Sequence, residues 1–271
     1  SVRKVFLPRT VAEMLVQRKA EIEELKEIHG SDAKIRNIIC KQLRTVAKKY
    51  GEPRKTEIVQ EEEVAVLKKE DFIEDYAVRF FLTEECYFKK IPQISLRSAG
   101  EQKLKEEDAM MMELDGTNRT ELLFFSDQQN VYKMKASDFT DGKASLLGDY
   151  LPNILNMEAE EKILYMVATT DYSGQMVFFF ANGKAAKVPL SVYETKTNRK
   201  KLINAYSSKA ELVRMAKLEE EADFMLMRNQ DKVTLINTEL IPASATKNAT
   251  GIQIFTLKKN SSVTQVFTAE E

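Results

Sequence analysis

A basic run, KTNRKK at residues 196–201, is the segment of the sequence best equipped to bind another molecule. It holds four cations in six residues, Lys196, Arg199, Lys200 and Lys201, with no acidic residue among them. Closely spaced lysine and arginine side chains can contact the successive negative charges of a polyanion. We interpret the run as a candidate polyanion contact; the alternative is a solvated stretch of surface, which has the same composition.

Residue types that commonly carry catalysis or bind metals are scarce. The chain has two cysteines in unrelated contexts, Cys40 and Cys86, and one histidine, His29. A disulfide framework, a zinc site and a Ser-His or Cys-His catalytic machine all need more of these residues. A phosphate-binding G-x-x-x-x-G-K-[ST] motif is also missing from the sequence, which has nine glycines. We therefore expect no catalytic residue, no metal site and no cofactor in this chain.

The composition predicts a folded, cytoplasmic protein. Of its 271 residues, 43% are hydrophobic and 31% are charged, which provides enough apolar material for a core and excludes a disordered chain. No apolar run approaches the roughly 20 residues of a membrane span, and no signal peptide opens the sequence. We expect no membrane partner.

Charge is unevenly distributed along the chain. Residues 1–60 carry 14 basic and 8 acidic side chains, whereas residues 61–170 carry 13 basic and 23 acidic ones. Residues 171–220 are again basic, with 9 basic and 5 acidic side chains. Because charges beyond about 8–10 Å are screened in physiological salt, a polyanion would respond to these local fields. The net charge of −1 therefore does not argue against a polyanion partner.

Helical spacing dominates the first 55 residues. Thr10 and Glu13 have the spacing of a capping box, which predicts a helix start, and Gly30 suits a left-handed position at that helix's end. A second apolar stripe at helical spacing runs on to Gly51. Because the connection is short, we expect an antiparallel α-helical hairpin over residues 1–55.

An internal repeat follows, and it predicts a mainly β, propeller-like domain over residues 56–271. Each copy reads as an apolar strand, a polar turn and a second strand, and in the third copy the turn is Asn182-Gly183, a dipeptide typical of tight hairpins. The four copies lie at residues 78–92, 121–135, 176–189 and 223–237. We expect about four to five blades. Four are indicated by the repeats, and a fifth, which the sequence does not itself show, could be assembled from irregular segments such as residues 56–67 with the C-terminal strand.

Aligning the turns places one residue of each copy in a common column. That column holds Lys90, Lys133, Lys187 and Leu235, and the next column is apolar throughout. We expect the lysines to point outward. We also expect burial at equivalent blade positions of Phe80, Phe124, Phe178 and Met225.

Several segments resemble the A subunits of bacterial type IIA DNA topoisomerases, the family of DNA gyrase and topoisomerase IV. KKYGEPRKTEI (48–58) is similar to the junction where a coiled-coil helix leaves the cleavage core, and GDYLPNILNMEAEEKI (148–163) resembles a signature between the second and third blades of the C-terminal domain. The hairpin segments ECYFKKIP, NVYKMK and NGKAAKVPL are similar to the family's blade motif. KNATGIQIFTLKK (247–259) resembles a segment that closes a blade.

The resemblance implies the end of the breakage-reunion coiled coil followed by a β-pinwheel, a propeller-like disc that binds double-stranded DNA. It implies that the parent protein is an ATP-dependent type II DNA topoisomerase, an isomerase in which A subunits form a homodimer and associate with a B-type subunit. ATP and Mg would serve that enzyme rather than this chain. The DNA-cleaving tyrosine would lie outside this chain.

One departure from the resemblance concerns the first blade. Gyrase A subunits carry a Gln-, Arg- and Gly-rich box soon after the first hairpin, and this box is implied to pin wrapped DNA. Here residues 93–108 retain Arg97, Lys103 and Lys105 but also hold four acidic residues. The segment looks like the degenerate box of topoisomerase IV A subunits. We therefore expect DNA to be bent rather than wrapped.

A disc of this kind would bind duplex DNA through phosphate contacts without reading bases. The candidate contacts are Lys133, Lys135, Lys184, Lys187, Lys196, Arg199, Lys200 and Lys201. Two alternatives stay open at this stage. One is a protein-interaction β-propeller that does not bind DNA, and the other is a gyrase wrapping domain whose box is not recognised in the sequence.

Overall fold

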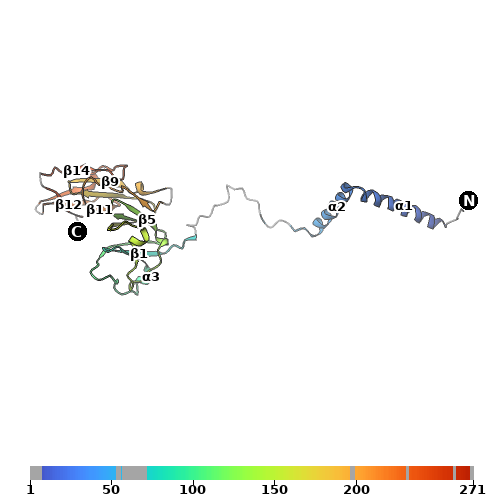
Figure 1. Ribbon diagram of the computed structural model, residues 1–271, viewed down its shortest axis with the longest axis horizontal. Helices are drawn as coiled ribbons and strands as arrows, with labels where there is room; N and C mark the ends of the chain where they lie inside the picture. Colours follow the sequence, from blue (N-terminus) through green and yellow to red (C-terminus); the bar gives the residue numbers. More distant parts are fainter. Residues whose placement is uncertain are drawn as a thin grey trace. The chain divides into compact units, whose positions relative to one another are not determined.

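The computed structural model describes residues 8–52, 56, 72–195, 199–229, 232–258 and 261–268. The chain divides into two compact units, Ser1–Val66 and Leu67–Glu271. Helices form the first unit and β-strands dominate the second (Figure 1). The domain boundary expected after residue 55 lies beside residues outside the described ranges and stays a prediction.

The N-terminal unit contains the two expected helices, α1 (Arg9–His29) and α2 (Asp32–Tyr50). Their ends differ in part from the expectation. Pro8 occupies the N-cap of α1 without a side-chain hydrogen bond, and Glu13 accepts a hydrogen bond from Arg9 instead of completing a capping box. Ser31 caps α2, since its side chain accepts a hydrogen bond from the backbone N–H of Lys34.

The antiparallel packing expected of the two helices is not present. Gly30 has φ −81° and ψ 0°, not the left-handed conformation, and Lys34 forms an ion pair with Glu27 across this junction. The helices follow one another around a bend (Figure 1). No described residue of either helix is buried, and Leu25 and Leu43 are 63% and 60% exposed. The helical expectation is therefore confirmed, but the hairpin packing was wrong.

The C-terminal unit is built from four small antiparallel sheets, which we call blades 1 to 4 (Figure 1). Blade 1 has the strand order β3-β1-β2-β6, blade 2 β7-β4-β5-β10, blade 3 β11-β8-β9-β14 and blade 4 β15-β12-β13. The strands of blades 1 and 2 are β1 (Ala77–Thr83), β2 (Tyr87–Pro92), β3 (Met110–Thr117), β4 (Glu121–Ser126), β5 (Val131–Lys135), β6 (Asp149–Tyr150), β7 (Ile163–Thr169) and β10 (Lys201–Leu202). Those of blades 3 and 4 are β8 (Gln175–Phe180), β9 (Lys184–Pro189), β11 (Leu212–Leu218), β12 (Asp223–Arg228), β13 (Lys232–Asn237), β14 (Ile252–Gln253) and β15 (Val263–Thr268).

Each blade centres on one copy of the sequence repeat. The four hairpins β1–β2, β4–β5, β8–β9 and β12–β13 are the four repeats, and a strand that follows each hairpin pairs along its first strand. In blades 1 to 3 a two-residue strand from beyond the next hairpin pairs with the hairpin's second strand. The expected propeller-like fold is confirmed, and the chain interlocks consecutive blades.

Apolar contacts between facing sheets form the core. In β4, Leu122 and Phe124 face blade 1, whereas the alternate residues Leu123 and Phe125 face blade 3. An aromatic pair lies at each junction, with ring centroids 5.5 Å apart for Phe88–Phe124, 6.3 Å for Phe125–Phe178 and 4.9 Å for Phe179–Phe224. Burial of one such ring contributes about 1.5–3 kcal/mol. Strands β4 and β8 are apolar on both faces because a neighbouring sheet covers each face.

The four residues expected at equivalent blade positions are not all equivalent. In blades 2 and 3 the equivalent residue lies one position before the expected phenylalanine. Phe80, Phe124 and Phe178 are all buried, but the residues that pair across the hairpin with the lysine column are Phe80, Leu123, Val177 and Met225. Met225 is only partly buried, because its side of blade 4 has no further sheet over it among the described residues. On the same side, Val233 and Leu235 are 57% and 62% exposed.

A buried carboxylate organises the turn of blade 2. Glu161 is 4% exposed and accepts hydrogen bonds from Ser126, from Asn130 Nδ2 at 2.9 Å and from the Tyr132 hydroxyl at 2.7 Å. Burial by itself would raise the pKa of Glu161, but these hydrogen bonds to the charged form outweigh it, so the pKa lies below its ordinary value.

Replacing this carboxylate should cost stability in a pH-dependent way. In Glu161→Gln an amide N–H group would face the donors that now bind the carboxylate, and we expect a loss of about 1–3 kcal/mol at pH 7. A lowered native pKa stabilises the fold fully above the unfolded value of about 4.3 and ceases to do so as the pH falls through the native pKa. Urea unfolding followed by circular dichroism at pH 7 and near pH 3 should therefore show a gap between wild type and variant that narrows in acid. The exposed neighbour Glu160→Gln is the control, and an equal loss in both variants would contradict the role of Glu161.

Candidate nucleic-acid interface

The lysine column lies inside the molecule, so the expectation that it points outward was wrong. Lys90, Lys133 and Lys187 are 3%, 5% and 4% exposed. They stand on the side of each hairpin that faces the next blade, where the neighbouring sheet covers them. In blade 4 no sheet formed by described residues covers that side, and the column position is taken by Leu235.

Each buried ammonium group joins its own blade to the segment that follows the next hairpin. Lys90 Nζ lies 3.0 Å from Asp141 Oδ1, and Lys133 Nζ donates to the carbonyl of Tyr193 at 3.1 Å. Lys187 Nζ donates to the carbonyl of Thr238 at 2.8 Å, after the next hairpin, and also to Glu221 Oε1 at 2.6 Å, just before that hairpin. Lys133 and Lys187 are therefore engaged within the fold and are removed from the candidate phosphate contacts.

Three cations of the basic run lie along the outer edge of blade 2. Lys201 begins β10 and pairs with Tyr132 of β5, while the backbone carbonyl of Lys200 accepts a hydrogen bond from the N–H of Lys133 at 2.8 Å. Arg199 and Lys200 are exposed. Lys201 is half-buried, with its Nζ 3.7 Å from Glu158 Oε1 and 5.3 Å from the centre of the Tyr132 ring. Pairing of β10 with β5 is what holds this basic run at the edge of the sheet.

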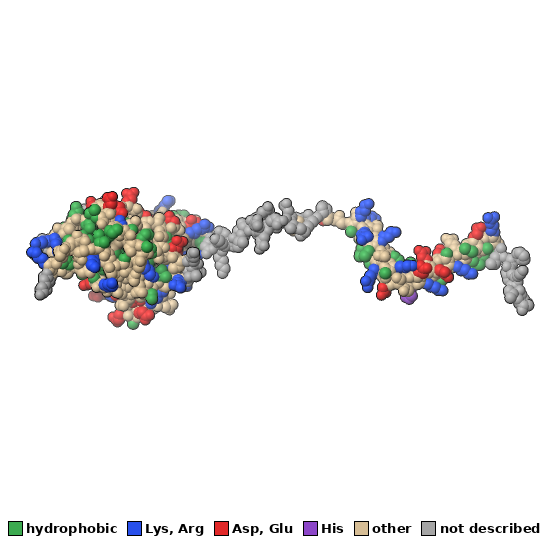
Figure 2. Space-filling view, turned by 90° about the horizontal axis from the view of Figure 1, so that it is seen from above, with side chains coloured by type: hydrophobic (Ala, Val, Ile, Leu, Met, Phe, Trp, Pro, Cys, Tyr) green, Lys and Arg blue, Asp and Glu red, His purple; other side chains and the backbone are tan. Residues whose placement is uncertain are grey.

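The remaining candidates are dispersed. Lys184 opens β9 in blade 3 and is partly exposed, and Lys135 ends β5 in blade 2 and is also partly exposed. Lys196 lies outside the described residues. On the face drawn in Figure 2, basic and acidic side chains of this unit form separate small groups.

Lys209 joins Lys184, and sequence reasoning missed it. After β10 the chain passes along the turn ends of blades 2 and 3, where the N–H of Ala205 donates to the carbonyl of Gln129 and the N–H of Ala181 donates to that of Glu211. Lys209 is exposed on this segment and borders one small cleft together with Lys184. An isolated lysine gives no signal in the sequence, because only the path of the folded segment brings it beside β9.

The segment at residues 93–108 is held against blade 1. It starts with α3 (Gln93–Leu96), and the buried Lys89 donates from its Nζ to Gln102 Oε1 and to the carbonyl of Lys103, both at 3.0 Å. Arg97, Lys103 and Lys105 are exposed, and Lys105 lies 3.9 Å from Glu85. Burial lowers the pKa of Lys89. The cations expected in a degenerate box are therefore accessible, but they share a small, fixed segment with four acidic residues.

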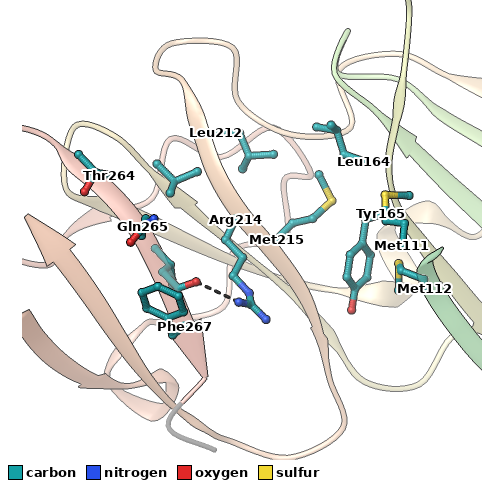
Figure 3. Close-up of a pocket in the computed structure, with 12 residues that line it drawn as sticks. Met111, Met112, Leu164, Tyr165, Leu212, Arg214, Met215, Thr264, Gln265 and Phe267 are labelled. Atoms are coloured by element: carbon teal, nitrogen blue, oxygen red, sulfur yellow. Dashed lines mark hydrogen bonds between the residues drawn. The ribbon is translucent and has the colours of Figure 1, made fainter. Parts of the chain in front are cut away.

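A cavity in this unit that is lined mainly by uncharged residues is not suited to a polyanion. It has a volume of about 630 Å³ and lies among the inner strands β3, β7, β11 and β15 (Figure 3). Met111, Met112 and Met215 contribute to its walls, and Arg214 is the single charged residue among the described residues that line it. Arg214 donates to the carbonyl of Val266 at 2.9 Å. Strong phosphate binding would need several cations here.

The described part of the chain lacks two further classes of site. No group of three or more His, Cys, Asp or Glu side chains there is arranged to hold a metal ion. None of the described helices is long and apolar enough to cross a membrane.

Comparison with known sequences identifies relatives. No protein-family model matches the chain. The A subunit of DNA gyrase from Campylobacter jejuni is 28% identical over 189 residues, which cover 66% of this chain and 22% of the relative. The A subunit of DNA topoisomerase 4 from Bacillus subtilis is 24% identical over 187 residues, which cover 68% of this chain and 23% of that protein. The chain thus spans about a fifth of the length of the curated relatives it matches.

Solved structures with the same fold are also known. The C-terminal domain of DNA topoisomerase IV aligns with a TM-score of 0.64 at 18% identity, over 73% of this chain and 62% of that one. The C-terminal domain of E. coli ParC aligns with a TM-score of 0.57 at 11% identity, over 71% of this chain and 79% of that one. At these identities the likeness establishes the fold alone.

The four interlocked blades and these alignments define a β-pinwheel of the kind found in C-terminal domains of type IIA topoisomerases. Over its C-terminal portion, the homologues of this chain are the A subunits of DNA gyrase and topoisomerase IV.

Replacement of the buried Lys187 should destabilise the fold, although this lysine contributes almost no charge to the surface. In Lys187→Met, the carbonyl of Thr238 and the Glu221 carboxylate lose their donor, and we expect a loss of about 1.5–3 kcal/mol in the free energy of unfolding. Urea unfolding would measure it, with the exposed Lys232→Met as the matched control. Equal stability of the two variants would contradict the structural role assigned to Lys187.

Proposed function

We propose that this chain is the DNA-binding and DNA-bending C-terminal module of the A-type polypeptide of a type IIA topoisomerase, nearer in behaviour to topoisomerase IV than to gyrase. In the parent enzyme it would present a crossing duplex for strand passage during relaxation and decatenation. The parent would be an isomerase that uses ATP and Mg, and its partners would be another copy of itself and a B-type subunit. Its DNA-cleaving tyrosine would lie outside this chain.

The observation that carries this proposal is the position of the exposed and partly exposed cations on blades 2 and 3. Arg199, Lys200 and Lys201 lie along the outer edge of blade 2, and Lys184 with Lys209 lies at the hairpin end of blade 3. A duplex can contact such a row through its phosphates, independently of base sequence. Bending a duplex by 40–90° costs on the order of 1–6 kcal/mol, which several phosphate contacts can offset.

Blade 1 supports bending rather than complete wrapping. Its segment at residues 93–108 has three cations and four anions. This balance of charge would not attract the phosphates of DNA. Lys89 and the backbone of Lys103 fix this segment to the blade, which limits its freedom to reach out to DNA. DNA contact would cover an arc on the later blades.

Salt-dependent DNA binding is the first test of this function. Fluorescence anisotropy with a labelled duplex should give binding at 50 mM salt that weakens by about tenfold or more at 200 mM, because phosphate contacts release counterions. Absent or salt-independent binding would contradict the proposal and favour a protein-interaction propeller.

Charge reversal tests the blade 2 edge. We expect the triple variant Arg199→Glu, Lys200→Glu and Lys201→Glu to weaken binding to duplexes of any sequence by about tenfold or more. The matched control is the triple variant Arg97→Glu, Lys103→Glu and Lys105→Glu, which changes the charge equally on blade 1 and should have a smaller effect. Circular dichroism would verify folding. Equal effects of the two variants would contradict a main contact on the blade 2 edge, and a larger effect of the control would favour blade 1.

Topology distinguishes bending from wrapping. The chain is incubated with nicked circular DNA, the nick is ligated, protein is removed and the linking number is measured. We expect no shift at protein concentrations that saturate binding, because an arc of contact does not close a turn. A large positive wrap per bound molecule would instead support a gyrase-like wrapping domain.

A further inference from the structure

A small cleft at the hairpin end of blade 3 has the chemistry of an anion site. Its volume is about 90 Å³, roughly that of three water molecules in the liquid, which is too small for a nucleotide. Three separate segments supply its polar residues. These are the β8–β9 turn, the connection from β10 to β11 and the loop before β14, which contribute Asn182, Lys184, Ser207, Lys209 and Thr250.

Tight backbone contacts hold these three segments together. Gly183 ends the β8–β9 turn with φ +77°. The N–H of Ala181 in that turn donates to the carbonyl of Glu211 at 2.9 Å, which joins the turn to the connection from β10 to β11. Gly251 lies so close to β9 that an added Cβ would stand 2.1 Å from the carbonyl oxygen of Ala185. Ser207 is 4% exposed. The walls of the cleft are therefore positioned by the fold and not by mobile side chains alone.

The polar groups at the cleft can all donate hydrogen bonds. Lys184 and Lys209 bring ammonium groups, and Ser207 and Thr250 bring hydroxyls. Asn182 uses its Oδ1 to accept from the N–H of Lys184, so its Nδ2 amide is the group left to donate to a ligand.

No negative charge competes with a ligand inside this cleft. None of the described residues lining it is acidic, and within the described part of the chain neither Lys184 nor Lys209 forms an ion pair. The exposed Glu211 follows closely in sequence but does not line it. Two cations with hydroxyl and amide donors suit the anionic oxygen atoms of a phosphate group.

We propose that this cleft binds one phosphate group of the DNA backbone and so anchors the duplex on blade 3. This inference rests on the proposed function and adds a defined position to it. The cleft lies on the same connection that begins at Lys201, so the duplex would run from the outer edge of blade 2 toward the hairpin end of blade 3. Lys209, Ser207 and Thr250 thereby become contact residues that the basic run does not include.

The experiment compares two double variants of the full chain. Lys184→Met with Lys209→Met removes both cleft cations, and Lys143→Met with Lys232→Met removes two lysines elsewhere on the surface. By fluorescence anisotropy, we expect the cleft variant to bind a labelled duplex about tenfold more weakly and to lower the slope of log K against log salt by about 1–2. The control should stay within about twofold of wild type. Equal losses in the two variants would overturn the proposal.

A second probe separates failure of the cleft from failure of DNA binding. Tripolyphosphate should raise the Tm of wild type and of the control by about 2–4 °C, and that of the cleft variant by less. If wild type does not bind duplex, the proposed function fails, and a selective tripolyphosphate shift would still support an anion site. If tripolyphosphate acts equally on all three proteins, the cleft is not an anion site. The variant Lys184→Arg with Lys209→Arg retains both charges and should restore both responses.

Discussion

Apolar packing between the faces of consecutive sheets is the interaction on which the C-terminal unit depends. Every central strand of blades 2 and 3 has a sheet on each side, so residues that alternate along β4 and β8 are buried in two different cores. A strand in this position cannot turn one side toward water. Long polar side chains on it must find partners inside the molecule, because an unpaired buried charge is costly.

The lysine column follows from that constraint. Lys90, Lys133 and Lys187 occupy the covered side of their hairpins, and each ammonium group is paired with oxygen atoms of the segment beyond the next hairpin. The same residues that resemble surface cations in the sequence therefore connect consecutive blades. Where the next sheet is missing from the described structure, in blade 4, the position holds an exposed Leu235 and no such connection is made.

The cations proposed as phosphate contacts consequently lie at edges and turn ends. β10 carries Lys201 along an outer edge, and the connection that follows brings Lys209 to the turn of blade 3. Residues 93–108, by contrast, are fastened to blade 1 by Lys89 and carry charges of both signs. The distribution of accessible charge around the unit thus reflects which segments cross between blades and which are fixed to a single one.

The sequence alone determined the local elements: two N-terminal helices, four strand–turn–strand repeats and the basic run beside the third. Periodicity and turn residues specify these features through short-range contacts. Gly183, for example, has the positive φ that the predicted Asn182-Gly183 turn requires. Tertiary structure decided which side of each strand is covered, and so it buried Lys133 and Lys187, brought Lys209 beside Lys184 and left α1 and α2 without side-by-side packing. When both faces of a strand are apolar, its own residues do not predict which segment packs on each face. That choice depends on contacts between segments that are distant in the chain.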